Sequence, residues 1–174
     1  MSALTLGKEH PDFATSLNNL AELYKDQGKY TKAELLYKRS LKIREKALGK
    51  EHPHVAQSLN NLALLYHSQG QYGKAEPLYK RSLEIKKKTL GSQHPDFAIS
   101  LNNLAELYKD QERYEEAESL CKQALAIVEK TFGPDHPNVA TVLLNMAACY
   151  RKMGKKKEAG RLEARAKKIW LQSN

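Results

Sequence analysis

The stretch HPHVAQSLNNLALLYHSQG, residues 52–70, decides the fold, because near copies of it occur elsewhere in the 174-residue chain. The copies are HPDFATSLNNLAELYKDQG at 10–28, HPDFAISLNNLAELYKDQE at 94–112 and HPNVATVLLNMAACYRKMG at 136–154. Each begins 42 residues after the one before it. Self-similarity at a fixed period of this length indicates a repeat protein, in which each unit packs on its neighbours.

Each copy has the spacing of an amphipathic helix. Apolar side chains recur at i, i+3, i+4 and i+7 after Pro11, which places them on one side of a helix. In the first copy they are Leu17, Leu20, Ala21 and Tyr24. After Gly28 a second helical pattern runs from residue 30 to about residue 48. The short break predicts an antiparallel hairpin of helix A and helix B, which must stack on its neighbours to bury both apolar stripes.

A His-Pro pair precedes each helix A. Proline suits the first turn of a helix, where its missing N–H is not needed. We expect the histidines to bond nearby backbone, because helices pack roughly 8 to 10 Å apart and zinc requires ligand distances of about 2 Å. The four histidines are His10, His52, His94 and His136.

These residues resemble the tetratricopeptide repeat. The similarity lies in the Leu-x2-Leu-Ala-x2-Tyr pattern of helix A and in the residues that follow it, Gly28, Tyr30, Ala33, Tyr37 and Ser40. The 42-residue period and the Leu-Gly-x-x-His-Pro linker are similar to the longer repeats of kinesin light chain and nephrocystin. The resemblance covers four units. It implies an all-α, right-handed superhelical solenoid of four antiparallel hairpins, in which helix A lines a concave groove that binds protein or peptide.

The predicted boundaries follow the His-Pro pairs. We predict one solenoid domain made of residues 1–9 as the tail of a preceding repeat, 10–51 as repeat 1, 52–93 as repeat 2, 94–135 as repeat 3, and 136–174 as repeat 4 with a polar C-terminal cap. Residues 5–10 repeat the linker at residues 47–52 closely, which indicates that tail. An uncovered apolar side on the first helix would let copies of the chain associate end to end.

The composition fits a folded protein, with 41% hydrophobic residues and a net charge of +9. No run approaches the roughly 20 apolar residues of a membrane span, and the first residues lack the apolar core of a secretory signal. We therefore expect a cytoplasmic protein. Residues 151–174 hold nine basic and two acidic side chains. This tail is interpreted as a charged cap or, alternatively, as a surface for RNA or an anionic membrane. Nucleic acid is disfavoured because no stacking platform is evident.

Sequence motifs of catalysis are absent. The chain has no phosphate-binding loop, no Gly-x-Ser-x-Gly and no His-Glu-x-x-His motif. Its two cysteines, Cys121 and Cys149, fall on buried helix faces and are interpreted as core thiols. We therefore predict a chain that is not an enzyme and needs no metal or cofactor.

The functional prediction concerns the side of helix A opposite its apolar stripe, where asparagine recurs. An amide offers a donor and an acceptor together, so a ladder of amides can bond the backbone of an extended peptide whatever its sequence. The expected binding residues are Asn18, Asn60, Asn102, Asn19, Asn61, Asn103, Asn145, Lys25, His67, Lys109, Arg151 and Lys152. Because Arg151 and Lys152 make one end basic, we expect an acidic group of the peptide near repeat 4.

Two alternatives stay open. The asparagines present in all four units (Asn19, Asn61, Asn103 and Asn145) are interpreted as structural, and the other three as ligand contacts. The first alternative is that the amides only bridge neighbouring repeats, because asparagine in a helix interior needs some compensation. The second is a structural array without a dedicated ligand, as the likeness of the first three units suggests.

Overall fold

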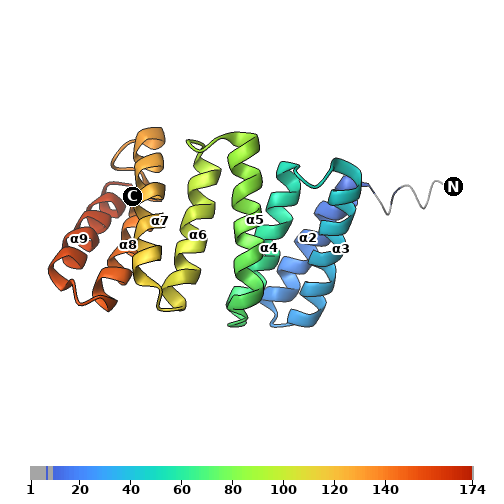
Figure 1. The fold of residues 1–174 in the computed structure, drawn as a ribbon, viewed down its shortest axis with the longest axis horizontal. Coiled ribbons are helices and arrows are strands. Elements are labelled where there is room, and N and C mark those ends of the chain that lie inside the picture. The colour runs from blue at the N-terminus through green and yellow to red at the C-terminus, as the bar shows by residue number, and fades with distance from the viewer. Residues whose placement is uncertain (1–6, 8–9, 174) are drawn as a thin grey trace. The chain divides into compact units, whose positions relative to one another are not determined.

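The computed structural model describes residue 7 and residues 10–173. Residues 10–173 form helices and no strands. The helices are α2 (Pro11–Asp26), α3 (Tyr30–Leu48), α4 (Pro53–Ser68), α5 (Tyr72–Leu90), α6 (Pro95–Asp110), α7 (Tyr114–Phe132), α8 (Pro137–Lys152) and α9 (Lys156–Gln172). They confirm the predicted all-α fold of alternating A and B helices (Figure 1). The predicted tail of a preceding repeat lies outside the described residues, apart from Gly7.

The chain divides into two compact units. Residues 1–89 form unit 1, with α2, α3, α4 and all but the last residue of α5, and residues 90–174 form unit 2, with α6 to α9. In unit 1, α2 packs on α3 and α3 on α4. In unit 2, α6 packs on α7, α7 on α8, and α8 on α9. Within each unit the hairpins therefore stack in sequence order.

A histidine caps the start of every helix A. The backbone N–H two residues later donates to the histidine Nδ1, over 3.3 Å at His10 and 3.1 Å at His52, His94 and His136. Each cap satisfies one of the N–H groups that the first turn of a helix leaves without a partner. The expectation that these histidines bond nearby backbone is confirmed.

Small side chains let the two helices of a hairpin approach closely. In unit 1, the Ser40 hydroxyl donates to the Ala14 carbonyl over 2.8 Å, and the Ser82 hydroxyl donates to the Ala56 carbonyl over 2.7 Å. All four residues are fully buried. These bonds join α3 to α2 and α5 to α4, and they satisfy buried hydroxyl groups that would otherwise cost stability.

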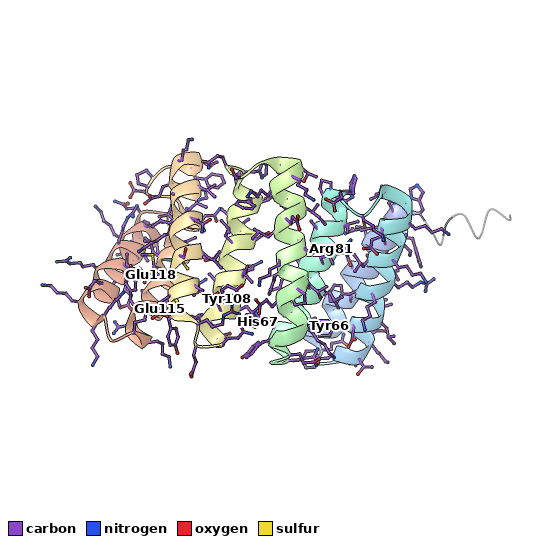
Figure 2. The ribbon with its side chains drawn as sticks, in the orientation of Figure 1. Tyr66, His67, Arg81, Tyr108, Glu115 and Glu118 are labelled. Carbon is purple, nitrogen blue, oxygen red and sulfur yellow. The ribbon has the colours of Figure 1, made fainter. Side chains whose placement is uncertain are left out.

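A tyrosine joins each second hairpin to the first within its unit. The Tyr66 hydroxyl of α4 donates to Glu34 Oε1 of α3 over 2.8 Å, and the Tyr150 hydroxyl of α8 donates to Glu118 Oε1 of α7 over 2.9 Å. Figure 2 labels Tyr66 and Glu118. The same contact in both units shows that helix B docks on the next helix A in one register.

The first helix has an exposed apolar side. Leu20 and Leu23 of α2 are 41% and 57% exposed. The equivalent residues of α8, Met146 and Cys149, are 7% and 1% exposed in a helix that packs on α7. The apolar side that helix A turns toward a preceding helix B is therefore uncovered in α2.

Between helices A and B, one residue takes a left-handed backbone conformation. Gly28, Gly70 and Gly154 have φ angles of 71°, 70° and 79°, whereas the equivalent residue of repeat 3 is Glu112, with φ 61°. A residue with a Cβ pays a steric penalty in this conformation, which glycine avoids. Repeat 3 therefore contains a strained turn that the other three repeats lack.

We predict that Glu112→Gly stabilises the protein. Relief of the left-handed strain is worth about 1 kcal/mol, which raises the thermal midpoint by roughly 2 to 4 °C in a chain of this size. Thermal unfolding followed by circular dichroism measures the shift. Glu115→Gly is the control, because glycine within α7 lowers stability by about 0.5 to 1 kcal/mol. An unchanged or lower midpoint for Glu112→Gly would contradict the strain.

Candidate peptide-binding surface

The candidate site is the accessible side of each helix A, which we call the helix-A surface. In unit 1 its exposed and half-buried members are Thr15, Asn19, Glu22, Lys25, Gln57, Asn60, Asn61, Leu64 and His67. In unit 2 they are Ile99, Asn102, Asn103, Glu106, Lys109, Thr141, Leu144, Asn145, Arg151 and Lys152. Most of the expected binding residues therefore lie on accessible faces, and Asn18 does not.

Two amides of unit 2 bond one another across neighbouring repeats. Asn145 Nδ2 on α8 donates to Asn102 Oδ1 on α6 over 3.1 Å, and both side chains are half-buried. An amide side chain has both a donor and an acceptor. The bond occupies the nitrogen of Asn145 and the oxygen of Asn102, which leaves the nitrogen of Asn102 and the oxygen of Asn145 for another partner. These two amides thus bridge repeats and still keep groups that can donate and accept, chiefly the NH2 of Asn102 and the C=O of Asn145.

Asn18 differs from its expected role as a ligand contact. It is only 6% exposed, and its Nδ2 donates to Ser58 Oγ of α4 over 3.5 Å, whereas Asn19 is exposed. In repeat 1 the first asparagine faces the following repeat and is covered by it, while the second faces away. The recurrence of an asparagine across units therefore did not separate structural amides from accessible ones.

The lysines of the helix-A surface lie close to carboxylates of their own repeat. Lys25 forms an ion pair with Glu22. Lys109 Nζ lies 3.8 Å from Glu106 Oε1 and 4.0 Å from Asp110 Oδ1. Their positive charge is therefore partly compensated, which weakens them as anchors for an acidic ligand.

The basic end in repeat 4 is also compensated. Arg151 makes two bonds to Glu163 of α9, over 2.6 and 2.5 Å, and its guanidinium lowers the pKa of that carboxyl by hydrogen bonding. Lys152 is exposed beside it. Arg151 is thus a less available anchor than its sequence position suggested.

His67 of unit 1 is labelled in Figure 2. It is half-buried, and its ring packs edge-on against Tyr72, with centroids 5.7 Å apart.

Sequence reasoning missed a buried cation in unit 1. Arg44, near the end of α3, is 2% exposed, and burial lowers its pKa. Its guanidinium donates to four neutral acceptors, which are His54 O at 3.0 Å, Gln57 Oε1 at 3.3 Å, Ser58 Oγ at 3.0 Å and Thr15 Oγ1 at 3.0 Å. Within residues 10–173 it forms no ion pair, and its Nε has no hydrogen-bond partner.

The buried amide of Asn18 belongs to the same network. Ser58 Oγ accepts from both Arg44 and Asn18, and the Asn18 Oδ1 atom has no partner. A buried polar atom without a partner is uncommon and calls for a physical reason. The junction between α2 and α4 therefore holds a buried positive charge, one unpaired donor and one unpaired acceptor.

The corresponding positions in unit 2 hold apolar side chains. Arg44 and Ser58 correspond to Val128 and Val142, which are 2% and 4% exposed. Two hairpins of this protein therefore stack without a buried cation. The signal in the sequence is that position 44 holds arginine, lysine, valine and tryptophan in the four repeats, whereas the residue before it is isoleucine in all four.

The described residues offer little for catalysis. No group of three or more His, Cys, Asp or Glu among them is placed to hold a metal ion. Burial raises the pKa of the Cys121 thiol to about 12 and also raises that of Cys149, so neither is an activated nucleophile. None of the helices in residues 10–173 is long and apolar enough to cross a bilayer.

Stacked helical hairpins with a polar, amide-rich face define a repeat scaffold of the binding type. A family model described as Tetratricopeptide repeat matches residues 4–88 and 96–172. The chain belongs to the tetratricopeptide repeat family, with repeats of the kinesin light chain-like kind. Repeats of this family generally mediate protein–protein interaction and are generally not enzymes.

Solved structures support this assignment. The chain is similar to BtubC (BKLC) from P. vanneervenii, with 29% identity and a TM-score of 0.85, over 95% of this chain and 66% of that one. It is also similar to a candidate kinesin light chain with nearly identical TPR-like repeats from Podosopora anserina, with 31% identity and a TM-score of 0.78, over 95% of this chain and 79% of that one. Aspartyl phosphate phosphatase F from Bacillus subtilis shares the fold alone, at 15% identity and a TM-score of 0.81, over 94% of this chain and 41% of that one. No curated protein matches the sequence.

We predict that the double variant Arg44→Val, Ser58→Val, which copies these two positions of unit 2, is more stable than Ser58→Val alone. Replacing a buried charge and its partners by apolar groups of similar volume is often neutral or stabilising. Ser58→Val alone loses about 1 to 3 kcal/mol, because it leaves the guanidinium with one acceptor fewer. Both variants remove the partner of Asn18, so their difference isolates the buried charge. Denaturant unfolding measures both variants and the natural protein. A double variant less stable than Ser58→Val would show that stacking needs Arg44.

Proposed function

We propose that this chain is a scaffold that binds an extended segment of another protein on its helix-A surface. The observation that carries the proposal is the bond between Asn102 and Asn145. This bond fixes the orientation of the two amides. Donor and acceptor groups of the pair remain available, and they can bond the C=O and N–H groups of a peptide backbone. Groups that are already ordered lose little conformational entropy when a ligand binds.

We further propose that unit 1 selects an acidic side chain at Arg44. Arg44 is a buried cation without a carboxylate partner in the described part of the chain. Two of its four neutral partners, Thr15 and Gln57, are exposed. Their side chains can therefore rotate away from the guanidinium when a ligand binds. A ligand carboxylate in their place gains a charge-assisted bond, which is roughly twice as strong as a neutral one.

The unpaired oxygen of Asn18 completes this subsite. This oxygen can accept a hydrogen bond. We propose that it accepts one from a backbone N–H of the peptide whose carboxylate binds Arg44. We therefore propose the acidic anchor at Arg44 and not near Arg151, because Glu163 already pairs with Arg151. The other predicted binding residues remain proposed contacts along the helix-A surface.

We propose no reaction and no cofactor for this scaffold. The cytoplasm is the proposed compartment, since both cysteines are free, buried thiols, as in most proteins of reducing compartments. The similarity to BtubC spans 66% of that chain, so the binding activity proposed is that of these repeats.

Association of two copies through α2 is a separate proposal. The exposure of Leu20 and Leu23, at positions that are buried in α8, supports it. Sedimentation velocity over a range of concentrations tests it. A chain that stays monomeric at the highest attainable concentration would remove it.

We predict that Asn102→Ala and Asn145→Ala each weaken peptide binding by at least tenfold, about 1.4 kcal/mol. Each variant loses an amide that contacts the peptide and frees the other amide to move. The probe is selected from synthetic peptides of roughly ten residues with a fixed central aspartate, a length that suits extended recognition. Fluorescence anisotropy with the selected peptide gives the affinity, and thermal unfolding checks the fold.

The matched control is Gln123→Ala, because Gln123 is an exposed amide on α7, away from the helix-A surface. It should bind the peptide normally. Loss of the Asn102–Asn145 bond alone costs about 1 kcal/mol of stability. Full peptide affinity together with a lowered midpoint in both asparagine variants would make these amides purely structural. A library that yields no binder would favour an array without a dedicated ligand.

A further inference from the structure

The basic residues of the C-terminal segment divide into two groups. Three of them hold unit 2 together through ion pairs, namely Arg151 with Glu163, Lys155 with Glu118 at 3.5 Å, and Arg165 with Glu129 at 2.6 Å. The remaining six, Lys152, Lys156, Lys157, Arg161, Lys167 and Lys168, are exposed. The net positive charge of the segment therefore resides in side chains that face solvent.

Three of these exposed cations lie on one side of α9. Residues at i, i+4, i+7, i+11 and i+14 share one face of a helix. On α9 this spacing gives the outer stripe, which consists of Lys157, Arg161, Ala164, Lys168 and Leu171, all exposed. The buried side of α9 holds Ala159, Ala166 and Ile169. The outer stripe carries three positive charges and no negative one, with small Ala164 in its middle.

The outer stripe is peculiar to α9. The equivalent residues of α7 are Glu115, Ser119, Lys122, Ala126 and Glu129, which mix both signs of charge. A polar end suffices to keep a repeat array soluble, and acidic side chains serve that purpose as well as basic ones. Capping therefore explains why this side is polar but not why its charge has a single sign.

The last turn of α9 adds one large apolar side chain to the outer stripe, because Leu171 is 71% exposed. Trp170 is 44% exposed, but the helical spacing places it near the side that holds Ala166, as expected for the equivalent of buried Val128. An exposed apolar side chain on a basic helical face is typical of helices that lie on a membrane surface.

We propose that the outer stripe of α9 binds an anionic membrane surface, with Lys157, Arg161 and Lys168 at the lipid headgroups and Leu171 in the interface. Each cation near an anionic leaflet contributes to binding, and Leu171 adds a part that salt does not screen. Nucleic acid is disfavoured because the stripe has no aromatic rings on which bases could stack. This surface is separate from the helix-A surface.

Sedimentation with lipid vesicles measures this contact. Vesicles of phosphatidylcholine with about 30% phosphatidylserine model the anionic leaflet. At low salt we expect the protein to sediment with these vesicles. Vesicles of phosphatidylcholine alone should not sediment it.

The variant Lys157→Gln, Arg161→Gln, Lys168→Gln removes the charge of the outer stripe. Partitioning to anionic vesicles should fall roughly 100-fold. The matched control, Lys42→Gln, Lys50→Gln, Lys87→Gln, removes the same charge from exposed positions in residues 10–89 and should partition normally. Leu171→Ser should reduce the part of vesicle binding that persists at higher salt, and circular dichroism checks that each variant folds.

Three outcomes would overturn the proposal. One is the absence of sedimentation with anionic vesicles at low salt. Another is an equal loss of partitioning in the stripe variant and the control, which would show that binding depends on net charge alone and not on the outer stripe. The third is binding to single-stranded poly(U) that is tighter than binding to vesicles and is lost in the stripe variant, which would assign the stripe to nucleic acid.

Discussion

The structure depends on the close approach of helix B to two A helices, its own and the next one in the unit. Buried alanines and the bonds of Ser40 and Ser82 to helix-A carbonyls set the first contact. The tyrosine bonds from Tyr66 and Tyr150 fix the register of the second. Packing against neighbouring helices occupies two sides of an inner helix A. Polar side chains can therefore lie on its remaining side without replacing apolar residues of the core.

This constraint explains why the polar groups have dual roles. Side chains at the junction of two A helices reach both a neighbouring repeat and the accessible surface, so Asn102 and Asn145 bridge repeats and still retain bonding capacity. Arg44 lies at such a junction with neutral partners only, whereas Val128 fills the equivalent place in unit 2. The same backbone arrangement thus forms with and without a buried cation at this junction, so Arg44 is not required for stacking and is available for a binding role.

The fold could be predicted from the sequence because its signals are local and repeated. The 42-residue period, the helical spacing and the His-Pro pairs placed the helices, and the histidine caps formed as expected. The details of the surface depend on which neighbour each side chain meets. Asn18 is covered by the next repeat and Glu163 reaches Arg151, and both contacts join residues that lie far apart in the sequence. The spacing of residues along the sequence does not show which side chains meet in the folded protein.

Nuclear magnetic resonance of the side-chain amides tests the central claim most directly. On titration with a selected acidic peptide, the account predicts that the Nδ2 hydrogens of Asn102 shift saturably, because this nitrogen is the donor left over by the bond to Asn145. The Nε2 hydrogens of Gln123, on α7, should stay unchanged. A peptide that binds with Asn102 unmoved, while resonances of the outer faces of α3 or α7 shift, would contradict the account.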